Sequence, residues 1–330
     1  MRKQSEIKKL MKRYIIIISL LVGSYSSVAQ EFLNPVQNQY IADNPYLISS
    51  AYAGIGDCWQ IRGVGFEQWV NIEDSPGTQS LSIDGRISDR SGVGAILYND
   101  ENGFTSQKGF QLSFAHHLTL DEWSNQYLSF GISYKFTQFG IDAQSFNDGN
   151  PDNPINPGLS NVSVNNSNFD IGFLYRLGRF FISANAINLL KKQLDDFNPT
   201  EPNVIQNYYV YTGYTFYHRF SDMEIEPSIL YQNFAGDGRS TTDMNLKVRK
   251  LLKRGDYIWG GVSMRSIVDQ DFKPLSVSPM IGIKKENFYV AYGYQVNVNE
   301  VFQPTTAAGS HMITLGFDFA CRQSKCGCTY

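Results

Sequence analysis

The sequence predicts an all-β fold: a closed, antiparallel transmembrane β-barrel of about 14 strands, with a short N-terminal segment that is either periplasmic or a plug. Three observations predict it. The chain opens with a secretory signal, strand alternation runs through most of the remaining residues, and the connections between the expected strands alternate between short and long. An even number of strands would also bring both chain ends to the same side of the membrane.

The first 29 residues form the secretory signal. Residues 1–13 are basic, residues 14–23 form a mostly apolar run, and Ser27-Val28-Ala29 resembles a cleavage site. Such a pattern is typical of a signal peptide, and its apolar run is too short to span a bilayer. We expect cleavage after Ala29. Since no cysteine lies near that position, a lipoprotein is not expected.

Loss of residues 1–29 makes the chain more acidic. It removes six of 28 Lys and Arg and one of 31 Asp and Glu, which leaves 22 basic and 30 acidic residues, a formal net charge of −8. That charge argues against a nucleic-acid partner. No later stretch is apolar enough for a transmembrane helix, yet 14% of the residues are aromatic. Either a soluble all-β protein or an outer-membrane barrel fits this composition.

Alternation gives the expected strands two unlike faces. Residues 126–138 place Leu128, Phe130 and Ile132 on one face, with serine and glycine between them. The strands run to about ten residues, which a tilted membrane-spanning strand needs, whereas soluble sheets usually have shorter strands. The candidate strands are residues 58–69, 76–86, 91–99, 107–119, 126–138, 166–177, 179–188, 206–219, 222–234, 239–252, 256–266, 273–284, 287–297 and 309–320.

The connections separate the two all-β classes. Those after even-numbered strands are short, whereas "DENGFTS", residues 139–165, 189–205 and 298–308 after odd-numbered strands are longer. Three other odd connections are fairly short, so the rule is a tendency. Outer-membrane barrels have short periplasmic turns and longer external loops, and a soluble sandwich has no reason to alternate in this way. We therefore expect a bacterial outer-membrane protein with both termini in the periplasm.

Tryptophans agree with this placement. Trp59, Trp123 and Trp259 fall near the predicted periplasmic ends of strands, and Trp69 falls near the external end of the first strand. Aromatic girdles of membrane proteins lie at these two interfaces.

Seven motifs resemble one family. "QNQY" and "SSAYAG" precede the first strand, "RGVGFEQW", "PGTQSLSIDG", "GVGAILYNDENG" and "LSFAHHL" come next, and "GSHMITLGFDF" closes the barrel. In this order they resemble the PorP/SprF family of Bacteroidota outer-membrane proteins over essentially the whole chain after the signal. The family usually has Asn-Pro where this chain has Ser49-Ser50, and an acidic residue where it has Met312.

The resemblance implies a part in the type IX secretion system and, in some members, in gliding motility. Its implied partners are the outer-membrane lipoprotein ring and a large surface adhesin or the adhesin's C-terminal domain. Candidate partner-contact or plug residues are Tyr40, Asn44, Pro45, Ala51, Tyr52, Ala53, Gly54, Cys326 and Cys328. Family-motif positions on the barrel are Arg62, Gln68, Trp69, Pro76, Thr78, Asp84, Gly85, Gly309, Ser310 and His311.

Residues 30–57 are not barrel-like. They carry apolar side chains, among them Phe32 and Tyr46, that a free tail would not need. This favours a plug inside the barrel over a flexible periplasmic lead. The chain thus divides into a signal peptide (1–29), the N-terminal segment (30–57), the barrel (58–320) and a cysteine-rich periplasmic tail (321–330).

The cysteines are Cys58, Cys321, Cys326 and Cys328, which allow three pairings if all are bonded. In a closed barrel the first and last strands are antiparallel neighbours, so Cys58 and Cys321 would lie nearly opposite each other. We hypothesise that these two form a disulfide. Pairing of Cys58 with a tail cysteine is the alternative, and the role of Cys326 and Cys328 stays open.

We predict no catalytic, cofactor or metal site. His116 and His117 are adjacent on a strand and so point to opposite faces, which favours ordinary structural or rim roles. The loop "NDGNPDNPINPG" has oxygen ligands but Leu159 at the place of a calcium-binding glutamate, which favours a solvated loop. A passive porin or FadL-like uptake channel is the first alternative function, and a lipid- or protein-modifying barrel enzyme is the second.

The face assignment carries its own test on the last strand. Leu315 should face lipid near mid-membrane, so Leu315→Arg should cost about 2–4 kcal/mol. Gly316 should face the lumen, so Gly316→Ser should be mild.

Overall fold

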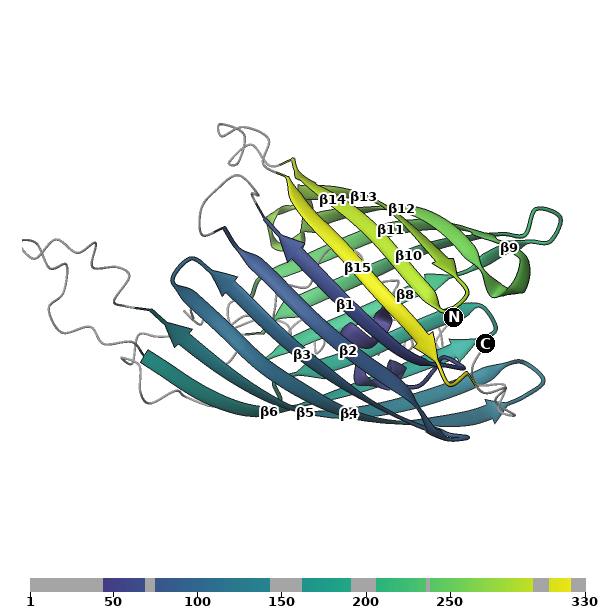
Figure 1. Cartoon of the computed structure of the whole chain (residues 1–330), viewed down its shortest axis with the longest axis horizontal. Helices are drawn as coiled ribbons and strands as arrows, with labels where there is room; N and C mark the ends of the chain where they lie inside the picture. Colours follow the sequence, from purple (N-terminus) through teal and green to yellow (C-terminus); the bar gives the residue numbers. More distant parts are fainter. Residues whose placement is uncertain are drawn as a thin grey trace, which may run out of the picture.

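The computed structural model describes residues 44–68, 75–142, 162–190, 206–235, 238–298 and 309–321. Within them the chain forms a closed, antiparallel barrel of 14 strands, as the sequence predicts. Figure 1 shows the barrel from the side, with β1 and β15 next to each other in its wall. No helix in the described ranges is long and apolar enough to span a bilayer.

The strands follow one another around the barrel in chain order. They are β1 (Trp59–Glu67), β2 (Gly77–Ser88), β3 (Ser91–Asn102), β4 (Thr105–Asp121), β5 (Gln126–Ile141), β6 (Val162–Leu177), β7 (Phe180–Ile187), β8 (Asn207–Tyr214), β9 (Phe216–His218), β10 (Met223–Phe234), β11 (Ser240–Leu251), β12 (Tyr257–Ile267), β13 (Lys273–Lys285), β14 (Phe288–Asn297) and β15 (Ser310–Phe319). Short 3-10 helices are η1 (Pro45–Leu47), η2 (Ser50–Tyr52), η3 (Lys253–Gly255) and η4 (Val268–Gln270).

Strand β9 continues β8 rather than adding a wall strand. Both pair with β10, and they are separated at Thr215, whose N–H donates to the carbonyl of Arg179 at 3.1 Å. The barrel closes where β1 pairs with β15, from Trp59 opposite Phe319 to Glu67 opposite His311. Closure leaves no strand at the start or end of the sheet without a neighbour.

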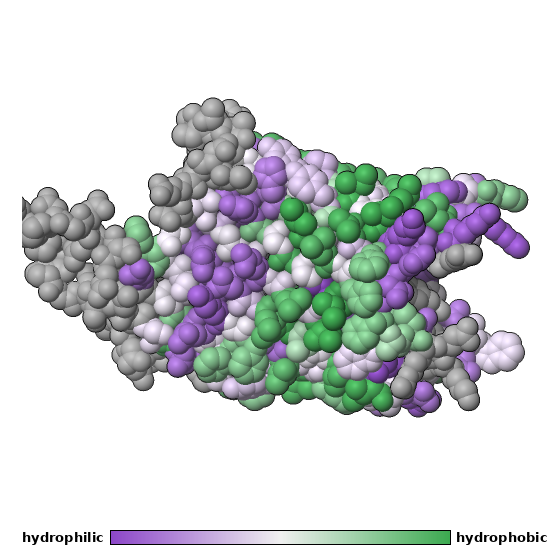
Figure 2. Space-filling model, in the orientation of Figure 1, coloured by the Kyte–Doolittle hydropathy of each residue, from purple (hydrophilic) through white to green (hydrophobic). Residues whose placement is uncertain are grey.

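The two faces of the wall differ as the alternation predicts. On β15, Leu315 points outward and is 57% exposed, whereas Asp318 points into the lumen and is 1% exposed. Figure 2 shows a band of hydrophobic residues across the visible outer face, with hydrophilic residues on either side of it. The outer surface is therefore apolar at the level of the band, where lipid would lie, while serine, asparagine and charged side chains line the inside.

The two ends of the barrel differ in their connections. At the end that holds Cys58 and Cys321, which we call the disulfide end, the strands join through tight turns, such as Gly178 (φ 57°) and Arg179 between β6 and β7. The opposite end, which we call the far end, holds the longest connections, including residues 142–161 and 188–206. This matches the alternation expected from the sequence.

Strand boundaries depart from the expectation in two places. The connection between β3 and β4 is the turn at Gly103 and Phe104 rather than the longer "DENGFTS". Strand β6 begins at Val162, not at residue 166, because the segment "VSVNNSN" pairs fully with β5. Serine and asparagine are poor strand formers on average, so their cross-strand pairing outweighs their intrinsic preference here.

Candidate functional site: the plug inside the barrel

Residues 44–57, which we call the plug, lie inside the barrel, where Figure 1 shows η1 and η2. Pro45 starts η1, where the missing N–H of proline costs nothing. The side chain of Ser49 caps η2 by accepting from the N–H of Ala51 at 3.1 Å. Ala51 and Ala53 have no exposed surface, and Tyr46 keeps 2%. The two short helices thus allow a compact chain to fit within the lumen.

The apolar side of the plug packs on strands β3 to β10. Tyr46, Ala51 and Tyr52 share one cluster with buried residues of the wall. The wall residues in this cluster are Ile96, Ala115, Leu174, Ile187, Tyr209, Tyr211 and Leu230. Burial of apolar surface is the main driving force for seating a segment of this kind.

Hydrogen bonds fix the position of the plug near its start. The Asn44 amide donates to the Ser82 hydroxyl at 3.1 Å, and the Tyr46 hydroxyl donates to Ser113 at 3.0 Å. Burial raises the pKa of Tyr46 and Tyr52 above the ordinary tyrosine value, because desolvation disfavours the phenolate. Both phenols therefore stay neutral at physiological pH.

A second set of hydrogen bonds holds the backbone near the end of the plug. Nε2 of His117 lies 3.0 Å from the carbonyl of Ala53 and therefore donates its proton, since a carbonyl can only accept. Nδ1 of the same ring lies 2.8 Å from the hydroxyl of Ser129. The N–H of Gly54 donates to Asp84 at 2.9 Å, and its carbonyl accepts from Nε of Arg86 at 2.9 Å.

Glycines in the wall make room for the plug. A Cβ added to Gly131 would lie 2.3 Å from the backbone nitrogen of Ala51, and one added to Gly92 would lie 2.2 Å from the carbonyl of Ala53. These distances are shorter than any real contact, so backbone would have to move. Only glycine permits such close approach of two backbones.

A buried charge cluster lies beside the seam between the first and last strands. Arg62 of β1 forms an ion pair with Asp318 of β15 at 2.7 Å, and Lys284 of β13 reaches the same carboxylate at 2.5 Å. The guanidinium of Arg62 also lies over the ring of Tyr289, 5.1 Å from its centre. Two cations on one carboxylate, all inside the lumen, link three strands electrostatically.

The hypothesised disulfide between Cys58 and Cys321 is present. It joins the residue before β1 to the second residue after β15, at the end of the plug. Next to it, the rings of Trp59 and Phe319 lie 6.3 Å apart. Covalent, aromatic and backbone links thus meet at the disulfide end of the seam.

The comparisons with known proteins now identify the family. The family model of the type IX secretion system membrane protein PorP/SprF matches residues 29–317, which is most of the chain. The chain belongs to the PorP/SprF family. No curated protein matches it.

One solved structure supports the barrel fold of this PorP/SprF chain. The toluene transporter TbuX of Ralstonia pickettii is similar at a TM-score of 0.51 and 10% identity, covering 89% of this chain and 96% of the other. A FadL homologue of Pseudomonas aeruginosa matches at a TM-score of 0.43 and 10% identity, covering 79% and 88%. At 10% identity the likeness to TbuX concerns the barrel fold alone.

Four of the PorP/SprF motif positions contact the plug, belong to the charge cluster or lie against an aromatic ring. Asp84 binds the plug, and Arg62 belongs to the charge cluster. Gly85 lies against the ring of Trp59 and Gly309 against that of Tyr294, where a Cβ would collide.

The remaining motif positions lie toward the far end. Thr78 donates to Asp100 at 2.5 Å, and the N–H of Gln68 donates to the carbonyl of Pro76 at 2.9 Å. Ser310 is buried in the lumen, and Nδ1 of His311 lies 2.7 Å from the Tyr292 hydroxyl on the outer face. The candidates that lie outside the described residues are Tyr40, Trp69, Cys326 and Cys328.

Sequence reasoning missed several residues that hold the plug, namely Ser82, Arg86 and Ser113, and also Ser129, which contacts the ring of His117. His117, expected to have an ordinary structural or rim role, is another plug contact. All five lie on the lumen face of β2, β4 or β5. A polar residue on the lumen side of a strand near the N-terminal segment was the available signal, but it does not distinguish these residues from other lumen serines.

Metal ligands do not gather in the described part of the chain. No group of three or more His, Cys, Asp or Glu side chains lies together there. The loop "NDGNPDNPINPG", weighed as a calcium site, lies outside the described residues.

Proposed function

We propose that this protein is a bacterial outer-membrane component of the type IX secretion or gliding machinery. In this proposal it supports the export or surface anchoring of a large adhesin through protein–protein contacts, without enzymatic activity. Family membership supports the link to type IX secretion, and the fold is that of outer-membrane barrels. The partners we propose are the outer-membrane lipoprotein ring and the adhesin or its C-terminal domain.

The seated plug is the observation that carries the proposal. A barrel for passive diffusion needs an open water-filled lumen. Here the protein's own chain occupies the lumen and is held there by at least five hydrogen bonds, the buried apolar cluster and the nearby disulfide. This arrangement favours a scaffold over an open porin.

We place the disulfide end in the periplasm, with both chain termini there. The tight turns at that end and the longer connections at the far end support this orientation, as in other outer-membrane barrels. Two variants, each with one added cysteine, test it in whole cells, in a protein in which Cys326 and Cys328 are replaced by serine so that the other two cysteines are those of the disulfide. Trp123→Cys alters a turn residue at the disulfide end that is 98% exposed, and Lys108→Cys alters an exposed outward position toward the far end.

A membrane-impermeant maleimide should label Lys108→Cys in intact cells and should label Trp123→Cys only after the outer membrane is opened. The opposite pattern would reverse the orientation. Labelling of both variants in intact cells would show that the reagent crosses the membrane, and the measurement would then be repeated with a larger maleimide.

Purification of the native complex tests the assembly role. We expect ring lipoprotein subunits or a large adhesin to co-purify with the tagged protein from gently solubilised outer membranes, and not with an unrelated tagged barrel. Absence of both partners would contradict the proposal. In planar bilayers the purified protein should show no porin-like conductance, and a large steady conductance would favour the channel.

A further inference from the structure

Strand β6 has two neighbours over only half of its length. Strand β5 pairs with all of it, from Ile141 opposite Val162 to Gln126 opposite Leu177. Strand β7 pairs only with Ile171–Leu177 and ends at Ile187. The far-end half of β6 therefore has a neighbour on one side only among the described residues.

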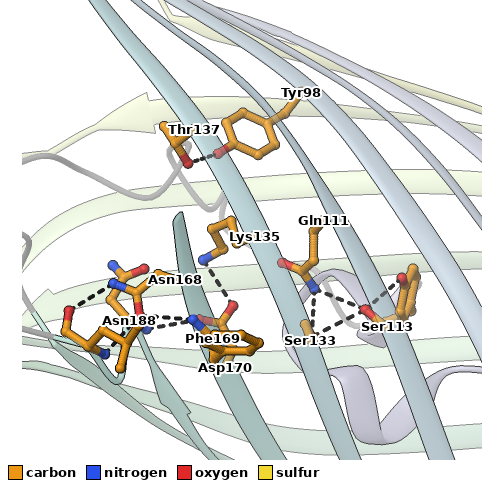
Figure 3. A network of polar contacts seen from close by, with 12 residues as sticks. Tyr98, Gln111, Ser113, Ser133, Lys135, Thr137, Asn168, Phe169, Asp170 and Asn188 are labelled. Atoms are coloured by element: carbon orange, nitrogen blue, oxygen red, sulfur yellow. Dashed lines mark hydrogen bonds and ion pairs between the residues drawn. The ribbon is translucent and has the colours of Figure 1, made fainter. Parts of the chain in front are cut away.

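Side chains of β6 redirect the chain where β7 ends. Figure 3 shows Asn168, Asp170 and Asn188 in this corner. The N–H of Asn188 (φ 57°) donates to Asp170 at 2.8 Å, and the N–H of Leu189 donates to the carbonyl of Phe169 at 2.9 Å. Asn168 binds both backbone groups of Leu190, at 2.8 and 2.9 Å.

Beyond this corner the edge of β6 pairs with no other strand among the described residues. Backbone groups of an antiparallel strand point alternately to its two neighbours. Because the carbonyl of Phe169 faces β7, the N–H and C=O groups of Ser163, Asn165 and Ser167 face the same side. Within the described residues these groups have no hydrogen-bond partner. They form a short row of donors and acceptors spaced for a further strand.

The open edge lies in water. An unpaired backbone is excluded from the hydrocarbon of a bilayer because each unsatisfied group costs several kcal/mol. The outward side chains of this stretch, Ser163, Asn165 and Ser167, are polar. On β6 the apolar outer face begins at Phe169, and on β5 it reaches Phe136, opposite Ser167. In the orientation proposed above, the edge stands at the cell surface.

Nothing in the sequence of this edge blocks pairing. Proteins usually protect exposed edges with proline, lysine, inward charges or bulges. Val162–Asn168 reads "VSVNNSN", with no proline or charge, and its pairing with β5 has no bulge. Its unpaired N–H and C=O groups can therefore pair with an added strand, which is a common mode of peptide recognition.

We propose that the edge formed by Ser163, Asn165 and Ser167 is a docking site for an extended segment of the exported polypeptide, which adds to β6 as an antiparallel strand. A backbone ladder selects an extended chain, and the hydroxyl and amide side chains favour small polar residues opposite them. This inference rests on the proposed function, since a secretion component meets exported polypeptide on this side of the membrane.

Asn165→Pro tests the edge in the native complex. Proline removes an N–H that faces the open side, so no hydrogen bond of the barrel is lost, and edge strands tolerate it. Asn165→Ala is the matched control, because it changes the same side chain and keeps the N–H. We expect Asn165→Pro to lower adhesin recovery about tenfold, which corresponds to the loss of one or two ladder hydrogen bonds. Asn165→Ala should retain it.

Amide exchange gives a readout that does not depend on recovery. In the purified barrel the N–H groups of Ser163, Asn165 and Ser167 should exchange quickly, and in the native complex about tenfold more slowly. The N–H of Phe169, already bonded to Asn168 at 2.9 Å, is the internal control and should not change. Slow exchange in the isolated barrel, or equally fast exchange in both samples, would overturn the inference.

The two proposals fail in distinguishable ways. If neither the ring lipoprotein nor the adhesin co-purifies with the wild-type protein, the proposed function fails. If both co-purify equally with wild type and Asn165→Pro, only the docking site fails. Heat-modifiable migration in gels should be the same for all variants, which excludes misfolding as the cause.

Discussion

At the scale of residues, the sequence predicts which way a side chain points but not what it meets. The outward position of Leu315 followed from alternation alone. Gly316 was expected to tolerate serine, yet a Cβ there would lie 2.7 Å from two atoms of the Arg62 side chain. Alternation has a period of two within one strand, whereas this contact comes from the neighbouring strand and depends on register and rotamer.

The corrected prediction concerns the two glycines of the seam. Gly316→Ala should destabilise the barrel by about 1–3 kcal/mol, because the new methyl group must displace a buried, ion-paired arginine. Gly65→Ala on the adjacent strand should be neutral or slightly stabilising, since no atom lies within 4 Å of its added Cβ. Urea unfolding of the barrels in lipid vesicles measures both. Equal effects of the two substitutions would contradict the crowding at Gly316.

The same assay tests the outer face. Leu315→Arg should cost about 2–4 kcal/mol, because a guanidinium would enter the apolar band. Thr314→Arg has the side chain on the lumen side and is its control for added charge on β15. A tolerated Leu315→Arg would contradict the face assignment.

The charge cluster carries a further prediction at this scale. Asp318→Asn should cost about 3–5 kcal/mol, because it leaves the buried Arg62 and the half-buried Lys284 without their shared counter-charge. The control is Glu101→Gln, which removes the exposed partner of Lys108 at 3.9 Å and should change stability by less than about 1 kcal/mol. A loss at Asp318 no larger than that at Glu101 would mean that the cluster adds nothing.

At the scale of elements, the plug and β6 show where prediction stops. The apolar side chains of residues 30–57 indicate that the segment packs somewhere, and 44–57 lie in the lumen. Its contacts could not be predicted, because they join residues as far apart in sequence as Tyr46 and Ser113. The start of β6 was placed too late for a different reason, since "VSVNNSN" has the composition of a loop.

Because the plug lies in the lumen, a substitution that displaces it should change the permeability of the barrel. Gly131→Leu should push η2 away from β5, because its side chain would occupy the place of the Ala51 backbone. We expect bilayer conductance to rise above the wild-type level while the barrel still folds. Ile132→Leu, one residue along on the outer face, should leave conductance unchanged. A folded Gly131→Leu barrel that stays closed would show that the plug is not what blocks the lumen.

At the scale of the whole molecule, fold class was the most predictable level. Strand periodicity, strand length and the alternation of connections each depend on the membrane and on barrel closure rather than on any single contact. They therefore agree even where single boundaries are shifted. The barrel wall is shorter at β7 than at β6, because β7 pairs with only about half of β6. This difference could not be predicted from the sequence, because it depends on where β7 ends beside β6.

The prediction at the scale of the whole molecule concerns removal of the disulfide. The bond spans a sequence separation of 263 residues, so the Cys58→Ser/Cys321→Ser variant should be less stable to unfolding by about 2–5 kcal/mol. Strand content should be unchanged by circular dichroism, because the β1–β15 pairing does not require the bond. A reductant should destabilise the wild type and have no effect on the variant. If the two proteins unfold alike under oxidising conditions, the bond does not contribute.

The Cys58–Cys321 bond also reports on the stage of barrel assembly. In the folded barrel, Cys58 and Cys321 are brought together where the first strand pairs with the last. We therefore expect the bond to form together with closure of the barrel. In a pulse-labelled culture, the disulfide-bonded fraction should rise as heat-modifiable, folded barrels accumulate, and a bond that forms before folding would contradict this expectation.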